Sequence, residues 1–274
     1  MKLSILVELL LAGLIGLVAA SSDPISVPAP VSVSVSSTPS CSDFNPETVK
    51  LITFDVFAAL MDLETSLIAS VKKISPSWDD RTVSNFVETW EGAYGDYAGT
   101  VFNESISGPE PFLWMLDSTL TQTLATQSLT ATDAQREALI KAWSYLTPWV
   151  NTKESLAKLY NAGFSLGALS NGDRNTLTTA MKVFLPDVKF TYIFPSDFPV
   201  GSFKPDAAMY DQLQTSTNFT TSEILHVAGA PIDGWGSRSA GLFSALLSLV
   251  PYPKKPFPCF LLKDITGVPP IFGL

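Results

Sequence analysis

The spacing of apolar residues changes along the chain, and each spacing predicts a different element. The run Leu51–Phe54, within the stretch LITFDVFAALMD, is continuously apolar, as is typical of a short strand covered on both faces of a parallel sheet. Residues 63–145 instead place apolar side chains three and four positions apart, as amphipathic helices do. After residue 152, apolar runs such as 164–171 and 224–230 alternate with helical patterns. This alternation predicts an α/β fold, a doubly wound Rossmann-like parallel sheet flanked by helices.

The helical block interrupts the predicted sheet. One strand precedes the block and the remaining strands follow it, so we interpret the block as an insertion. We expect an α/β core made of residues 48–62 and 150–274, with an inserted helical cap at 63–149. Open α/β sheets bind their ligands at the carboxyl ends of the strands. A cap placed over such an end suits a gated active site.

The N-terminal segment has the pattern of an export signal. Residues 1–20 combine one positive charge, an apolar stretch and small residues before Ser21, which predicts a cleaved signal peptide. The alternative is a membrane anchor, because the apolar run approaches membrane-spanning length. Glu8 interrupts the run and no basic flank follows it, so we expect cleavage, no stable membrane span afterwards, and a secreted or secretory-pathway protein. The Ser/Pro-rich arm at 21–47 suits an extended segment.

Composition and charge narrow the functional classes. The net charge of −9 argues against nucleic-acid binding, which needs a basic face. Cys41 and Cys259 either pair, as cysteines of exported chains often do, or are two free or buried thiols. The glycosylation motifs that begin at Asn103 and Asn218 favour a glycoprotein. The single histidine, His226, lies inside an apolar strand pattern, so we interpret it as a core or sheet-edge residue.

Polar residues follow several of the predicted strands. Asp55 ends the first strand, and Ser170 and Asn171 end the second. Lys204 lies just before a predicted helix, and Asp233 follows a later strand. Because the carboxyl ends of parallel strands meet at one edge of a sheet, we expect these side chains to converge on one crevice. The set offers a nucleophilic acid, a cation and a second acid.

The order of these motifs resembles the haloacid dehalogenase superfamily. The closer similarity is to its type II 2-haloacid dehalogenase branch, including fungal secreted relatives, over residues 48–274. Any one motif alone would be a weak signal, whereas four in this order make a strong one. The four motifs are FDVFAALMD at Asp55, Ser170-Asn171-Gly172, Lys204-Pro205 followed by Tyr210, and the acid Asp233 after an apolar strand.

The resemblance implies roles for these residues. Asp55 would attack an electrophilic carbon or phosphorus and form an ester that water then hydrolyses. Lys204 would keep Asp55 ionised, and Asp233 would orient Lys204 or the hydrolytic water. The chemistry calls for no cofactor and no metal, its partner is a small-molecule substrate, and a homodimer is one assembly state that the sequence leaves open. The substrate-binding residues would be Ser170, Asn171 and Tyr210.

Two positions argue against a phosphatase of this superfamily. Phosphatases carry a second aspartate two residues after the nucleophile, where this chain has Phe57. They also carry a further acid in the fourth motif, where this chain has Gly229. A carbon electrophile needs neither acid, so phosphoryl transfer is disfavoured.

Other departures put the substrate in question. The family's Gly-Thr pair after the nucleophile is Ala58-Ala59, its cap arginine is Glu91, and two polar residues before the last acid are Ala228 and Ala230. We expect a haloacid dehalogenase-like hydrolase whose nominal reaction is hydrolytic dehalogenation of 2-haloalkanoic acids. Two alternatives remain: a hydrolase of another carbon electrophile or ester in secondary metabolism, and a catalytically impaired binding protein.

Overall fold

The computed structural model describes residues 41–274. The predicted signal peptide and all of the predicted arm before Cys41 lie outside these residues. No helix within the described range is both long and apolar enough to cross a bilayer.

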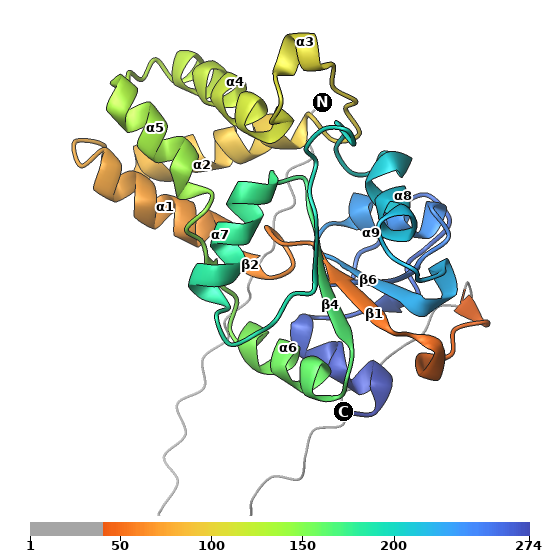
Figure 1. Ribbon diagram of the computed structural model, residues 1–274. Helices are drawn as coiled ribbons and strands as arrows, with labels where there is room; N and C mark the ends of the chain where they lie inside the picture. The colour runs from red at the N-terminus through yellow and green to blue at the C-terminus, as the bar shows by residue number, and fades with distance from the viewer. Residues whose placement is uncertain (1–40) are drawn as a thin grey trace, which may run out of the picture. The chain divides into compact units, whose positions relative to one another are not determined.

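The centre of the fold is a six-stranded sheet in which every strand pairs in parallel with its neighbours. The order is β5-β4-β1-β6-β7-β8, so the first strand lies between strands that follow the helical block (Figure 1). Its four residues are all buried, as the unbroken apolar run predicts. The strands are β1 (Leu51–Phe54), β4 (Ser165–Leu169), β5 (Tyr192–Phe194), β6 (Ile224–Ala228), β7 (Phe243–Leu246) and β8 (Phe260–Leu261).

Helices connect and cover these strands. Several are fixed at their first turn by the residue before them: Asp173, for example, accepts hydrogen bonds from the backbone N–H and the hydroxyl of Thr176. The α/β fold predicted from the strand–helix alternation is confirmed. The helices of the core are α6 (Thr152–Asn161), α7 (Arg174–Phe184), α8 (Ala207–Thr215) and α9 (Pro231–Ser239), with short 3-10 turns at Pro46–Thr48, Thr221–Glu223, Ile265–Gly267 and Pro269–Phe272.

A separate group of helices lies between two short strands, β2 (Met61–Asp62) and β3 (Thr147–Pro148). These strands pair antiparallel, which brings the start and the end of the inserted segment together. Figure 1 shows the group beside the parallel sheet. All of its helices fall inside the predicted cap span, 63–149. They are α1 (Leu63–Ile74), α2 (Asp80–Gly95), α3 (Glu104–Ser107), α4 (Pro111–Thr126) and α5 (Asp133–Ala142).

Aromatic side chains join the inserted helices to the loop after β1. Phe57 stacks on Phe112 of α4 at 5.3 Å between ring centroids, and it meets Trp143 edge-on at 5.7 Å. Trp143 in turn contacts the buried Trp90 of α2 at 5.6 Å. Large buried rings contribute strongly to packing free energy. The inserted helices are therefore anchored beside Asp55.

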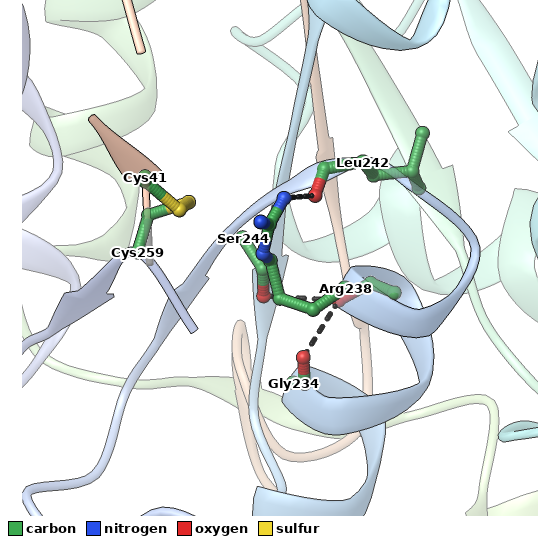
Figure 2. The surroundings of a disulfide bond; sticks show 7 residues. Cys41, Gly234, Arg238, Leu242, Ser244 and Cys259 are labelled. Carbon is green, nitrogen blue, oxygen red and sulfur yellow. Dashed lines mark hydrogen bonds between the residues drawn. A yellow bond between two sulfur atoms is a disulfide. The ribbon is translucent and has the colours of Figure 1, made fainter. Parts of the chain in front are cut away.

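A disulfide links Cys41 to Cys259, two residues that are 218 positions apart (Figure 2). Of the two alternatives that the sequence leaves open for these cysteines, the structure has the pair. Both side chains are buried. The bond ties the first described residues to the start of β8, and Figure 2 shows it near Arg238, whose guanidinium donates to the Leu242 carbonyl oxygen at 2.6 Å.

Candidate active site

Asp55 lies at the carboxyl end of β1, with its backbone N–H still bonded to Val227 of β6 at 2.9 Å. The chain then turns back over the side chain. The backbone N–H groups of Ala58 and Ala59 donate to Asp55 Oδ2 at 2.9 and 3.2 Å. Only 8% of the residue is exposed. The turn therefore fixes one carboxylate oxygen and holds the group in a single orientation.

Lys204 bridges the two acids predicted to act together. Its Nζ donates to Asp55 Oδ1 at 2.8 Å and to Asp233 Oδ2 at 2.8 Å. A third hydrogen bond goes to the Leu169 carbonyl oxygen at 3.2 Å, so all three donors of the ammonium are used. Burial alone would lower the pKa of Lys204, but Asp233 and Asp55 more than offset that effect, and the pKa lies well above its ordinary value. Lys204 is therefore a permanent cation between two carboxylates.

Asp233 comes from the first turn of α9 and is buried. Tyr210 donates its hydroxyl to Asp233 Oδ1 at 2.8 Å. Burial would raise the pKa of Asp233, but Lys204 and then His226 outweigh it, and the pKa lies well below the usual range of an aspartate. Asp233 is therefore ionised throughout the physiological range.

His226 belongs to this cluster, although the sequence pattern only marks it as a core or sheet-edge residue. The ring is fully buried, and its Nε2 lies 3.0 Å from Asp233 Oδ2. Its Nδ1 lies 3.0 Å from the Thr53 hydroxyl. Thr53 and His226 are register partners on β1 and β6. The sequence does show Thr53 and His226 as polar residues inside otherwise apolar strands, which could have marked them as members of the site. It does not show the strand register that places them opposite each other.

A cavity of about 190 Å³ opens beside the three charged groups. Asn171 faces it, and its Oδ1 accepts a hydrogen bond from the Lys204 backbone N–H at 2.8 Å. Two predicted substrate-binding residues do not line it: Ser170 is fully buried, and the Tyr210 hydroxyl donates to Asp233. Their direct contact with substrate stays a prediction. The lining residues are Asp55, Phe57, Ala58, Leu63, Tyr94, Gly95, Ala98, Asn171, Lys204, Ala230, Ile232 and Asp233.

Tyr94 is the polar group that the inserted helices contribute to the cavity. Burial and then the negative charge of Asp55 raise its pKa well above that of a free tyrosine, so its hydroxyl keeps its proton. No motif in the sequence marked Tyr94. Its place depends on how α2 packs over the sheet, and apolar spacing along one helix does not specify that packing.

The packing around Phe57 and Gly229 bears on which class of reaction the site can perform. Phe57, two residues after Asp55, is stacked in the aromatic cluster and offers no acid or hydrogen-bond donor. A Cβ at Gly229 would lie 2.5 Å from the Ala59 nitrogen, closer than atoms can approach. A carboxylate at position 229 is therefore incompatible with the turn that holds Asp55.

Glu91 of α2 lies close to two other acids. Its Oε1 is buried and has no hydrogen-bond partner among the described residues. Burial, reinforced by Glu64 and Asp62, raises the pKa of Glu91 from its ordinary 4.5 to about 7. In the sequence resemblance this position is compared with the cap arginine of the family, and the residue here is an acid that ionises near pH 7 and supplies no positive charge.

Comparison with known proteins agrees with this fold. The family of haloacid dehalogenase-like hydrolases matches residues 114–247. L-2-haloacid dehalogenase of Xanthobacter autotrophicus superposes with a TM-score of 0.71 at 18% identity, over 82% of this chain and 99% of the other. The chain adopts the haloacid dehalogenase fold. One curated relative is (S)-2-haloacid dehalogenase 4A of Burkholderia cepacia, which is 23% identical to this chain over 206 residues. The match covers 72% of this chain and 80% of the relative. An (S)-2-haloacid dehalogenase of Pseudomonas putida is 23% identical over 192 residues, 70% of this chain and 80% of the relative.

Proposed function

We propose that this haloacid dehalogenase-like chain hydrolyses a carbon–halogen bond through a covalent ester on Asp55. The observation that carries the proposal is the geometry around that carboxylate. Two backbone N–H groups and the Lys204 ammonium hold it in one orientation at the wall of a largely apolar cavity. A desolvated, oriented carboxylate is a nucleophile suited to displacement at carbon.

The reaction balances in two steps. An Asp55 oxygen attacks the carbon that bears the halogen, the carbon–halogen bond breaks, and the halogen leaves with the bonding electrons as halide. Water then attacks the carbonyl carbon of the Asp55 ester, which releases the alcohol and restores the carboxylate. Asp233 lines the cavity and can orient the attacking water, whose released proton passes to solvent. The net change is replacement of halide by hydroxide, with release of one proton.

Phosphoryl transfer fits these residues less well. A phosphatase of this superfamily needs an acid where Phe57 is stacked and another where Gly229 has no space. These contacts support a carbon electrophile.

The names of the relatives give the nominal substrates. Two curated relatives are (S)-2-haloacid dehalogenases, and a structural neighbour from Xanthobacter autotrophicus was solved with chloropropionic acid covalently bound. We therefore take 2-haloalkanoic acids as the first substrates to test. Another carbon electrophile or an ester is the second candidate, and the observation that favours it is the acidic Glu91, three residues before the lining residue Tyr94 on α2.

We also propose that the protein works outside the reducing cytosol. The Cys41–Cys259 disulfide is of the kind that persists in oxidising compartments. Asn103 and Asn218, at the two glycosylation motifs, are exposed. Both features support a secreted or secretory-pathway glycoprotein, and mass measurement of the protein from its native culture would test each modification.

Halide release tests the proposed reaction. The folded protein is incubated with 2-chloropropionate and 2-bromopropionate, and free halide is measured alongside Asp55→Asn. Asp187→Asn is the matched control, because Asp187 is an exposed acid away from the cavity. Release that is lost in Asp55→Asn and kept in Asp187→Asn supports the proposal, and release that survives Asp55→Asn overturns it.

A further inference from the structure

The one cation that lines the cavity has no capacity left for an anionic substrate. Within the described residues, Lys204 is the sole basic side chain of the lining. Its three N–H donors are already directed at Asp55, Asp233 and the Leu169 carbonyl oxygen. An ammonium has three donors and no more. A substrate carboxylate could bind Lys204 only by displacing one of these three acceptors.

The surroundings of the cavity add negative charge. Asp55 and Asp233 are both in the lining, so together with Lys204 the lining has one excess negative charge. Glu91 lies three and four residues before Tyr94 and Gly95, which places it on the face of α2 that borders the cavity. Its charged neighbours are Asp62 and Glu64, the two residues on either side of the lining residue Leu63. An anion that entered would meet carboxyl groups at the rim as well as inside.

The remaining polar groups suit an uncharged ligand. Tyr94 keeps its hydroxyl proton, because burial raises its pKa well above the usual value. The Oδ1 of Asn171 accepts from the Lys204 backbone, and the Asn171 side chain also makes a hydrogen bond with Tyr94, so both side chains present neutral polar groups to the cavity. The other lining residues are apolar or glycine, Phe57, Ile232 and Ala230 among them. A volume of about 190 Å³ limits the ligand to a small molecule.

We infer that the preferred substrate is a small, uncharged 2-halo carbonyl compound, such as a 2-haloamide, in preference to the 2-haloalkanoate anion. The inference rests on the proposed carbon–halogen hydrolysis and names its substrate class. Its basis is the saturation of Lys204 together with the excess of carboxyl groups around the cavity. Glu91 then acts as a specificity-determining residue at the rim.

Binding of unreactive analogues separates charge from reactivity. Propionamide and propionate have nearly the same shape and differ by one charge, and neither can lose a halide. Calorimetry on the full protein should give a Kd for propionamide that is lower by about 10²-fold, the size expected for one repulsive charge pair a few ångströms apart at a protein surface. Equal affinities, or tighter binding of propionate, overturn the inference.

Turnover and two matched variants complete the test. The kcat/KM for 2-chloropropionamide should exceed that for 2-chloropropionate. At a pH above the Glu91 pKa of about 7, where this carboxyl is ionised, Glu91→Gln should narrow the difference between amide and acid by about tenfold, in both turnover and analogue binding. Glu88→Gln removes the same charge from an exposed position of α2 and should leave the gap unchanged. A gap that Glu91→Gln does not alter contradicts the role of Glu91.

The outcomes also distinguish this inference from the reaction on which it rests. Halide release from the acid that is faster than from the amide overturns the inference and leaves the proposed reaction intact. Halide release from neither compound, with folded protein that binds propionamide no more tightly than propionate, overturns both. Preferential binding of propionamide without any turnover overturns the reaction alone, since the cavity would still select an uncharged ligand.

Discussion

His226 Nε2 lies 3.0 Å from Asp233 Oδ2, on a ring that is fully buried between β1 and the acid. The same Asp233 oxygen accepts a hydrogen bond from Lys204 at 2.8 Å. The cavity thus has a second layer of contacts behind it, running from Thr53 through His226 to Asp233. Such outer contacts orient the groups that meet a substrate.

Replacement of His226 should affect the rate more than binding. His226→Phe keeps the size of a buried ring and removes both hydrogen bonds, so Asp233 loses one partner and its orientation is less fixed. We expect kcat to fall by about tenfold or more with KM nearly unchanged, and the free energy of unfolding to fall by about 1–3 kcal/mol. Steady-state kinetics with a denaturation curve would check both. A rise in KM alone would show that the ring shapes the substrate pocket instead.

Lys204 should be essential for both stability and activity. Lys204→Met removes the cation and leaves Asp55 and Asp233 facing each other in a buried site. Breaking a buried ion pair from one side costs about 3–5 kcal/mol, so the free energy of unfolding should fall by that amount and halide release should vanish. Lys153→Met, at an exposed position of α6, is the control. A Lys204→Met protein as stable as the original would contradict the ion-pair geometry.

Glu91 should make the protein less stable as pH rises. The pKa of Glu91 is about 7 in the folded chain and 4.5 for an ordinary glutamate, because burial and two neighbouring acids disfavour its charge. The unfolded chain therefore loses this proton first, and folding stability declines as pH rises from about 4.5 to about 7. Glu91→Gln cannot ionise. Its gain in melting temperature should be near zero below this window and reach about 2–4 °C above it.

A melting series across that window, with Glu88→Gln measured in parallel, would check the effect. A stabilisation by Glu91→Gln that is the same at both ends of the window would mean that the Glu91 carboxyl ionises alike in the folded and unfolded chains.

Gly229 should tolerate no side chain. An alanine Cβ would lie 2.5 Å from the Ala59 nitrogen, one of the two donors that hold Asp55. Gly229→Ala should displace that turn and lower kcat by about 10²-fold, the usual cost of losing one such donor. Gly92→Ala in α2 meets nothing within 4 Å and is the matched control. Full activity in Gly229→Ala would show that the turn does not orient the nucleophile.

The position of the two acids in the charged centre could be predicted from the sequence, because Asp55 and Asp233 each follow a strand. Asp55 and Asn171 come at the carboxyl ends of β1 and β4, and the sheet brings such ends together whatever the details of packing. Tyr94 could not be placed in the same way, since its position depends on how an inserted helix lies over the sheet. His226 required the register of β6 against β1. The sequence left two alternatives for Cys41 and Cys259, a disulfide or two free thiols, and only the fold shows that the two side chains meet.

The most direct test of the account follows oxygen through one turnover. The protein, in excess over 2-chloropropionamide or 2-chloropropionate, reacts through a single turnover in oxygen-18 water. The masses of the Asp55-containing peptide and of the released alcohol are then measured by mass spectrometry. Because water attacks the ester carbonyl, the label should enter the Asp55 carboxylate and the alcohol should carry ordinary oxygen. Label in the alcohol, with none on Asp55, would show that water attacks the substrate directly and would contradict the ester mechanism.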